Sequence, residues 1–325
     1  MTMPVSPEEA NMAKTGSMPA PAMTGATKAV RAGERSVPTM LLAPTMIIMT
    51  VVGLYPLLHS LYISLTNYNP TFGTSYSFIG LANYARAFGD GQFWYSVVLT
   101  LGFTTISVSC SLTLAVLLAL LFNQNRLGFV VLRTFLLIPM LITPIAVGII
   151  WRTMMMPDLG ILNYLLSLIG APPLAWASSP NSALASIILV DVWQWTPFMF
   201  IIIFAGLRSL PRSPFEAAAI DGAGHLATFV NVTLPMLKPV IVIATLLRIV
   251  DAFRTYDTVY IITRGGPDFA TDLLSVYLQR VNFRIFDLGY GSALSWIALI
   301  IVLVVVIVFV NLTGFLKLVA DKENR

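Results

Sequence analysis

The stretch SPFEAAAIDGAG occupies residues 213–224 and places a short run of alanines, glycines and a few polar residues inside a very apolar chain. Ser213 is a suitable N-cap, Pro214 suits the first helical position, and Glu216 stands three residues after the cap, which is the pattern of a capping box. Gly222 can end the helix in a left-handed conformation. The stretch therefore predicts a helix of about two turns between two apolar segments.

A helix this short is unstable alone in water, because the cost of nucleation exceeds the gain from its few hydrogen bonds. It therefore needs a partner, and local chemistry leaves two interpretations open. It is either a well-capped connector on the membrane surface or a helix that docks into another protein. In the second case its small face, Ala217 and Ala218, would enter a cleft, and Glu216 and Asp221 would meet basic groups there.

The composition is that of a membrane protein. The chain has 325 residues, is 57% hydrophobic and 10% charged, and has a mean hydropathy of +0.83. Soluble domains carry about 25% charged residues, and the charge-poor stretches here exceed the roughly 20 residues that cross a bilayer as helix. Because lipid cannot satisfy an open backbone, we expect an all-α polytopic protein. The net charge of +4 is spread over loops and tails and does not indicate nucleic-acid binding.

Hydropathy and loop composition predict six transmembrane helices. We expect them at about residues 40–65, 93–122, 134–154, 183–207, 239–262 and 292–315. The first 37 residues are rich in Pro, Ala, Ser, Thr and Met and are expected to be a disordered cytoplasmic tail. We therefore divide the chain into this tail (1–37), a six-span domain (38–318) that includes the loop 209–238, and a short C-terminal tail (319–325).

The distribution of basic residues predicts the orientation. With the N-terminus inside, the inner segments hold Lys14, Lys28, Arg31, Arg35, Arg126, Arg133, Arg208, Arg212, Lys238, Lys317, Lys322 and Arg325. The outer loops hold only Arg86, Arg152, Arg264, Arg280 and Arg284. The positive-inside rule therefore places both termini and the loop 209–238 in the cytoplasm.

The lone cysteine and the two histidines suggest no reactive or metal site. Cys110 lies in an apolar run and is expected to be a packing thiol. His59 and His225 are far apart and lack metal-ligand spacing, so no metal site is expected.

Charged residues inside the fifth predicted span are unusual. Arg248, Asp251, Arg254 and Asp257 follow at steps of three with alternating sign, a spacing at which helical neighbours can pair. A charge in a span costs several kcal/mol unless it is paired or hydrated. One interpretation is a self-neutralising ladder that fixes helix packing, and the other, which we favour, is the polar wall of a water-filled translocation cavity.

The fourth predicted span carries Asp191 at a similar depth. Asp191 would lie about 10 Å from the outer end of its span and Arg254 about 12 Å from the end of the fifth, at about 1.5 Å per residue, so the two could pair or share a ligand. Trp193 and Trp195 follow, and their faces suit sugar rings, although packing or interfacial anchoring explains them equally well. On a continuous fifth helix, Tyr256 would face away from Arg254.

From Glu216 the sequence reads E-A-A, three residues, Gly222, nine residues, and then VTLP, which ends in Leu234 and Pro235. This spacing resembles the EAA motif of bacterial ABC-importer permeases, EAA-x3-G-x9-I-x-LP, with Val232 in place of the isoleucine. The stretches FIGLANY, WQWTPF, AGLRSLP and YDTVYIITRGGP resemble the carbohydrate-importer branch of that family. The resemblance covers about residues 40–315.

The resemblance implies a type I ABC-importer permease fold in a bacterial plasma membrane, with the loop forming a cytoplasmic coupling helix. It implies a sugar as cargo, in particular a disaccharide such as trehalose. The implied partners are a second homologous permease in a heterodimer, two copies of an ATPase subunit, an extracytoplasmic solute-binding protein and membrane lipid. Within the motif, it assigns coupling to Glu216, Ala217, Ala218, Asp221, Gly222, Leu234 and Pro235.

No catalytic residue and no bound cofactor are expected in this chain. It contains no Gly-Lys pair and hence no phosphate-binding loop of the usual type, so ATP and Mg²⁺ are expected to be used by the partner ATPase. The turn at 263–271 is either a hinge or a surface near the docked binding protein. An ion-coupled secondary carrier is the alternative, but it does not explain the loop 209–238. An intramembrane enzyme using Asp251 and Asp257 is disfavoured, because six residues place them on nearly opposite helix faces.

Overall fold

The structure is a computed structural model that describes residues 26–73, 75–124 and 128–315. Residues 1–25 and 316–325 lie outside this description, and with them most of the expected N-terminal tail and the whole C-terminal tail. The basic residues Lys14, Arg126, Lys317, Lys322 and Arg325 also lie outside it. The chain divides into two units, Met1–His59 and Ser60–Arg325, each of which is described by itself.

The described part of the first unit belongs to helix α1, Ala26–Ser64. The portion Leu42–Ser64 is long and apolar enough to cross a membrane, as the sequence predicts. The described part of the helix extends back to Ala26, so residues 26–37, which belong to the expected tail, are helical. Ala, Lys, Arg and Glu are frequent in that segment and favour helix, so the helix of the span continues toward the N-terminus.

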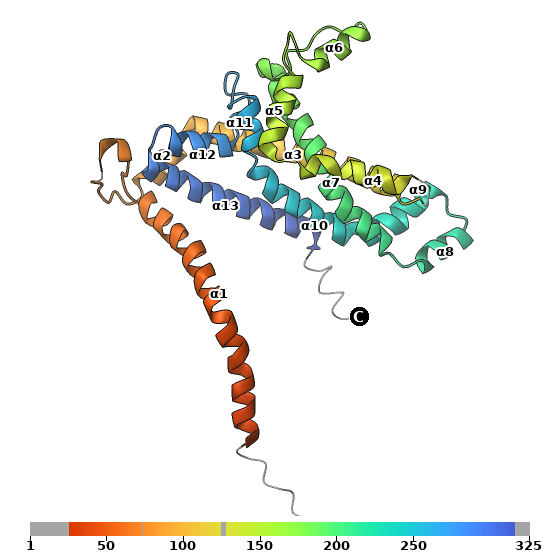
Figure 1. Ribbon diagram of the computed structural model, residues 1–325, viewed down its shortest axis with the longest axis horizontal. Coiled ribbons are helices and arrows are strands. Elements are labelled where there is room, and N and C mark those ends of the chain that lie inside the picture. The colour runs from red at the N-terminus through yellow and green to blue at the C-terminus, as the bar shows by residue number, and fades with distance from the viewer. Residues whose placement is uncertain (1–25, 74, 125–127, 316–325) are drawn as a thin grey trace, which may run out of the picture. The chain divides into compact units, whose positions relative to one another are not determined.

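The second unit is a helical bundle whose long members are α3 (Gly91–Phe122), α7 (Pro180–Arg208), α10 (Leu234–Phe253) and α13 (Leu288–Thr313) (Figure 1). Among the described residues, five helices including α1 could span a membrane, or six if one bent pair counts as a span. The only strand-like contact in the described part is a single bridge between Thr66 and Phe78. The predicted all-α, six-span class is thus confirmed.

The third span is broken rather than continuous. It consists of α4 (Phe129–Leu141) and α5 (Pro144–Met154), which meet at an angle of 96°. Ile142 and Thr143 between them are extended. Proline disfavours helix in the residue before it and lacks an amide donor, so Pro144 ends α4 and starts α5, and the prediction of one helix over 134–154 was wrong.

The fifth span also differs from the prediction. Helical structure starts at α9 (His225–Thr228), passes through a π-helical turn, η4 (Phe229–Thr233), and continues into α10. It stops at Phe253, and a separate helix, α11 (Asp257–Ile262), follows. A continuous helix over 239–262 was therefore wrong, and the last two charges of the expected ladder lie beyond the end of α10.

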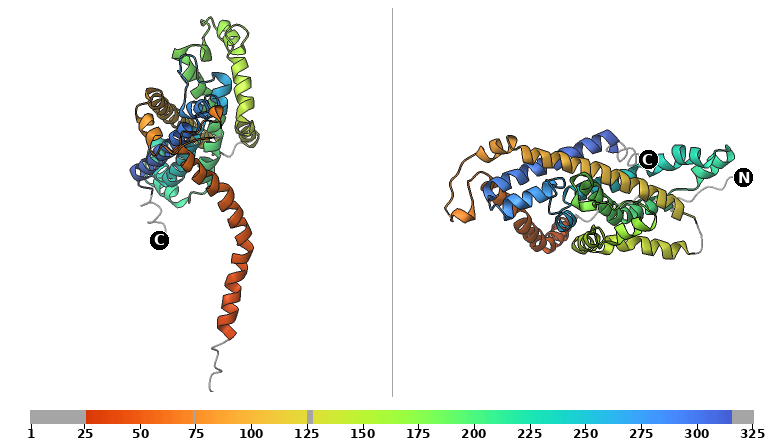
Figure 2. Two further views of the ribbon diagram at one scale, coloured as in Figure 1. Left: turned by 90° about the vertical axis from the view of Figure 1, so that its left-hand side faces the viewer. Right: turned by 90° about the horizontal axis from the view of Figure 1, so that it is seen from above.

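The long helices of the second unit pack closely. Helix α3 lies against α7 and α10, α7 also contacts α10 and α4, and α13 contacts α10 (Figures 1 and 2). A Cβ on Gly206 of α7 would lie 2.8 Å from a methyl of Val240 on α10, so the absent side chain permits this approach. Small residues at helix crossings are typical of membrane bundles. Cys110 of α3 is exposed, not packed as expected.

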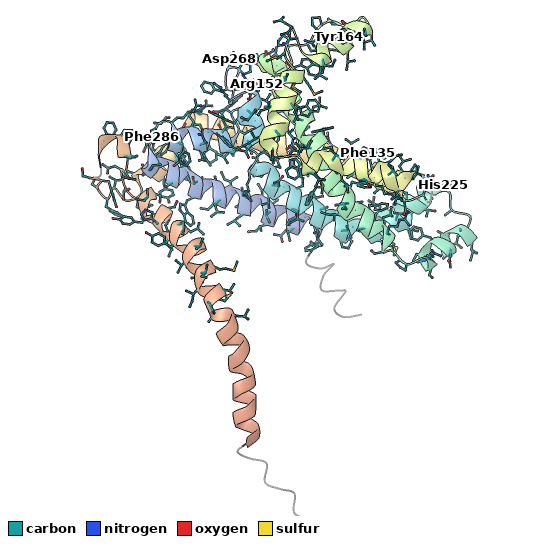
Figure 3. The ribbon with its side chains drawn as sticks, in the orientation of Figure 1. Phe135, Arg152, Tyr164, His225, Asp268 and Phe286 are labelled. Carbon is teal, nitrogen blue, oxygen red and sulfur yellow. The ribbon has the colours of Figure 1, made fainter. Side chains whose placement is uncertain are left out.

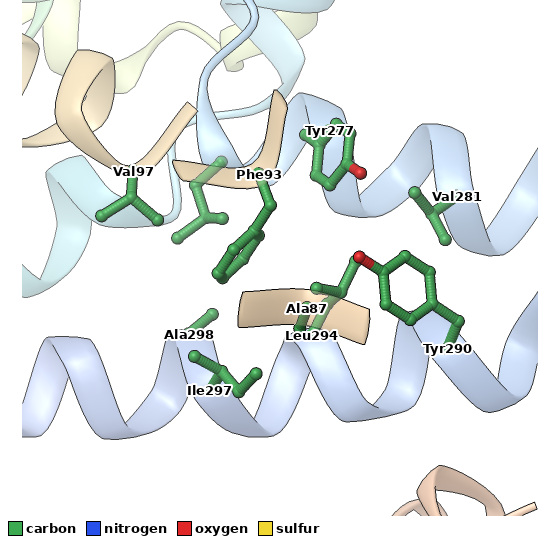
Figure 4. Close-up of a cluster of buried hydrophobic side chains, with 10 residues drawn as sticks. Ala87, Phe93, Val97, Tyr277, Val281, Tyr290, Leu294, Ile297 and Ala298 are labelled. Carbon is green, nitrogen blue, oxygen red and sulfur yellow. The ribbon is translucent and has the colours of Figure 1, made fainter. Parts of the chain in front are cut away.

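The end of the bundle formed by α2 (Ala82–Phe88), α12 (Leu274–Phe283) and the start of α13 contains a cluster of buried hydrophobic side chains, among them Tyr277 and Tyr290 (Figure 4). Asp90 caps α3 by accepting from the amides of Gln92 and Phe93, and it also accepts hydrogen bonds from the hydroxyls of Tyr277 at 2.5 Å and Tyr290 at 2.6 Å. Burial raises the pKa of Asp90, but these four donors outweigh it and the pKa is lowered. The carboxylate therefore stays charged and joins three helices.

The remaining elements are short. They are η2 (Pro70–Phe72), α6 (Ile161–Leu168), η3 (Trp176–Ser178) and α8 (Ser213–Ile220). Tyr164 on α6 stands well away from the bundle (Figure 3). Asn163 stabilises this segment, since its side chain bonds the backbone of Pro157 and Leu174 and accepts from the indole of Trp176. The segment between α5 and α7 is therefore an ordered structure, although the sequence suggests only a loop.

Candidate functional site

A polar cavity of about 190 Å³ lies where the two helix breaks meet α7. Pro144 contributes from the start of α5, Trp195 from α7, and Asp251 from α10. Residues 254–258, between α10 and α11, supply the rest of the wall. Backbone freed by a broken helix is tolerated at membrane depth only where it is buried in protein or lines a wet cavity, so the breaks and the cavity belong together.

Close contact between α5 and α11 holds the two breaks side by side (Figure 1). A Cβ on Gly148 of α5 would lie 2.9 Å from the Cβ of Ile261 on α11, so glycine is needed at this crossing. The hydroxyl of Thr258 donates to the carbonyl of Pro144 at 3.3 Å. Arg152 donates to the carbonyl of Ile261 at 3.2 Å. These contacts hold α5 against α11 beside the cavity.

A buried ion pair lies behind the cavity wall. The guanidinium of Arg248 on α10 donates to the carboxylate of Asp191 on α7, and the hydroxyl of Ser107 on α3 donates to the same oxygen. Arg248 is 0% and Asp191 2% exposed. A buried charge is tolerated only when paired and hydrogen-bonded, so this pair fixes three helices relative to one another.

Asp251 connects the buried pair to the cavity. Its carboxylate accepts a hydrogen bond from Arg248 at 3.1 Å. The side chain of Asp251 is 43% exposed, whereas that of Arg248 is fully buried. The same guanidinium lies 5.6 Å from the ring centre of Trp195, within the range of a cation–π interaction. One buried arginine thus orients both a carboxylate and an indole that face the cavity.

The predicted pathway residues therefore divide into three groups. Trp195, Asp251, Arg254 and Asp257 line the cavity, and Asp191 and Arg248 lie behind it. Trp193 belongs to neither group, because it packs edge to face against Trp151 at 5.4 Å. Instead of meeting Arg254, Asp191 is paired with Arg248, because Arg254 lies beyond the end of α10.

Sequence reasoning missed Tyr256 and Ser107. A continuous helix would turn Tyr256 away from Arg254, but the break brings both into the cavity wall. The phenol hydroxyl of Tyr256 can donate as well as accept a hydrogen bond. Only a weak feature of the sequence points to Ser107, since it is one of several small polar residues along the buried face of α3.

A helix is present where the sequence predicts one, as α8 (Ser213–Ile220), but it starts differently. Ser213 is the first helical residue and not the cap, and no side chain caps the helix. The amides of Phe215 and Glu216 instead bond to the carbonyl of Arg212, at 3.0 and 3.1 Å. Gly222 has a φ of +72° and ends the segment as expected.

The surface of this loop is open. Glu216, Ala217, Asp221 and Gly222 are exposed, and Ala218 is partly so. Two apolar side chains at variable positions of the motif, Ile220 at 86% and Leu226 at 76%, are also exposed. His225 begins α9 beside them (Figure 3), and Leu234 and Pro235 begin α10. Exposed apolar side chains on a short helix are typical of an interaction surface.

Comparisons with known proteins agree with this architecture. The structure aligns with a bacterial alginate ABC transporter, solved in complex with an alginate pentasaccharide-bound periplasmic protein, at a TM-score of 0.76 and 20% identity over 86% of this chain and 95% of that one. The fold is therefore that of ABC-importer permeases.

The sequence profile of the binding-protein-dependent transport system inner membrane component family matches residues 111–318, and the chain belongs to this family. It is 42% identical to the probable ABC transporter permease protein y4oQ of Sinorhizobium fredii, over 81% of this chain and 85% of that protein. It is 36% identical to the trehalose/maltose transport system permease protein MalF of Thermococcus litoralis, over 89% and 97%.

Proposed function

We propose that this chain is the permease subunit of an ATP-driven importer in a bacterial plasma membrane, and that it moves a sugar through the cavity at the two helix breaks. The observation that carries this is the combination of an indole, two carboxylates, a guanidinium and a phenol around one small polar cavity. Aromatic faces suit the apolar faces of sugar rings, and the other groups suit hydroxyls. Membership of the family argues against an ion-coupled secondary carrier.

A disaccharide such as trehalose is the proposed cargo. The relative from Thermococcus litoralis is named for trehalose and maltose. The cavity is lined by anionic hydrogen-bond acceptors and a cationic hydrogen-bond donor, and the hydroxyls of a neutral polyol can bind to both kinds of group. The cavity of about 190 Å³ holds only part of a disaccharide. We therefore propose that the second permease subunit of a heterodimer supplies the opposite wall.

We propose that α8 couples this cavity to the ATPase. The assembly would contain two ATPase copies, which use ATP and Mg²⁺, and an extracytoplasmic binding protein that delivers the sugar. ATP binding closes the ATPase pair and moves α8, and the spans change from inward-facing to outward-facing. Such alternating access is a population shift that requires ATP to bind the closed state more tightly.

The test is sugar-stimulated ATPase activity of the assembled complex in proteoliposomes across a panel of disaccharides. In the Asp251→Ala variant we expect the sugar concentration for half-maximal stimulation to rise about tenfold, the effect of losing one charge-assisted hydrogen bond, with assembly unchanged. Trp193→Phe is the matched control, because Trp193 packs outside the cavity. Unchanged sugar dependence in Asp251→Ala would refute the cavity, and uptake by this chain alone without ATP would refute the importer.

A further inference from the structure

A second cavity, of about 330 Å³, lies at the C-terminal end of α7. The segment that contains α6 precedes the other end of this helix. The ends of two membrane-spanning helices form it, with Asn123 following α3 and Arg208 closing α7. The start of α8 completes the wall with Arg212 and Phe215. Because α3 and α7 are candidate membrane spans and both end here, we place the cavity near the membrane surface.

The cavity is amphipathic. Leu207 and Leu210 contribute an apolar floor, with Leu207 7% exposed. The guanidiniums of Arg208 and Arg212 are at exposed positions of the wall. None of the described residues that line it carries a carboxylate. The adjacent Glu216 belongs to the open face of α8 and does not line it.

Further positive charge stands next to the cavity. Arg133 of α4 donates to the carbonyl of Phe122 at the end of α3. The guanidinium carbons of Arg133 and Arg208 lie 4.6 and 5.3 Å from the ring centre of Phe204. Three arginines therefore gather where α3, α4 and α7 reach the membrane surface.

We propose that this cavity binds the headgroup of an anionic phospholipid. A guanidinium matches the geometry of a phosphate and can bind it through two parallel hydrogen bonds. The leucine floor accepts the glycerol and the first methylenes of an acyl chain. A zwitterionic headgroup is disfavoured, because the described lining offers no carboxylate for its amine. The bound lipid contacts Phe215 and thereby the base of α8.

The experiment titrates the purified transporter complex in detergent with phosphatidylglycerol or phosphatidylcholine of the same acyl chains, and counts bound lipid by native mass spectrometry. We expect preferential binding of phosphatidylglycerol. An arginine near the membrane surface contributes about fivefold to the affinity for an anionic lipid. Arg212→Gln should therefore lower the affinity about fivefold, and the double variant with Arg208→Gln about 30-fold. Lys238→Gln is the matched control, since Lys238 is an exposed cation near the start of α10 but does not line the cavity.

Equal binding of the two lipids, or wild-type phosphatidylglycerol binding in the double variant, would overturn the proposal. Complete displacement of the lipid by millimolar inorganic phosphate would also overturn it, because the site would then be a plain anion site. Arg212→Gln alone keeps the test decisive if the double variant unfolds, since Arg212 is exposed. Lipid binding is measured without sugar or ATP, so it can fail or succeed independently of the proposed transport function.

Discussion

Replacing Asp191 by alanine would leave Arg248 buried with only a partial counter-charge. Arg248 is fully buried, whereas its remaining partner, Asp251, is 43% exposed and 3.1 Å away. Breaking a buried ion pair by removing one partner costs about 3–5 kcal/mol. Because Asp251 retains part of the interaction, we expect a loss of about 3 kcal/mol in the free energy of unfolding. The Ser107 hydroxyl would also lose its acceptor.

The assay is reversible unfolding of the purified permease in mixed micelles, followed by helix content. The double variant Asp191→Leu with Arg248→Met is the informative comparison, because replacing both charges with apolar side chains of similar size is often neutral or stabilising. We therefore expect the double variant to lie within about 1 kcal/mol of the wild type. Its sugar-stimulated ATPase activity should nevertheless fall, since Arg248 no longer orients Asp251 and Trp195.

Two results would refute this reasoning. An Asp191→Ala variant as stable as the wild type would mean that the pair contributes nothing to folding. A double variant as unstable as the single variant would mean that the loss comes from packing and not from the unpaired charge of Arg248.

Three further predictions concern other parts of the chain. Glu216→Lys should lower ATPase co-purification at least tenfold with permease stability unchanged, and normal retention would contradict coupling through α8. Asp90→Asn should lower the free energy of unfolding by about 2 kcal/mol at neutral pH. Because the pKa of Asp90 is lowered in the folded protein, the stabilisation by its carboxylate is present above the pKa of the unfolded chain and is lost as the pH falls through the pKa of the folded protein. The difference in stability between the variant and the wild type should therefore vanish in acid. Gly206→Val should cost about 1–3 kcal/mol through its clash with Val240, whereas Gly102→Ala, with open space around it, should not.

Hydropathy predicted the existence of the membrane helices well, because a bilayer imposes its length on any segment that crosses it. The predicted second, fourth and sixth spans agree with α3, α7 and α13 to within about four residues. The predictions were wrong where a span is broken, at Thr143 and after Phe253. A hydropathy window measures only the length of an apolar segment. Because both halves of a broken span are apolar, it does not detect the break.

The candidate site was predicted in its residue types but not in its arrangement. Charge within a predicted span drew attention to Asp191, Arg248 and Asp251, because such residues are costly unless they are paired or hydrated. Which of them pair depends on the crossing of α3, α7 and α10. The direction of Tyr256 was predicted from a continuous fifth helix, but α10 ends at Phe253, before this residue.

The sequence by itself therefore determined the membrane class, the length of most spans and the EAA-like spacing from Glu216 to Pro235, since each depends on local composition or on fixed offsets along the chain. Only the tertiary structure decided that Asp191 pairs with Arg248, that Trp193 lies outside the cavity while Tyr256 lines it, and that arginines gather at the end of α7. These features depend on side chains far apart in sequence that meet only when the helices bend and pack.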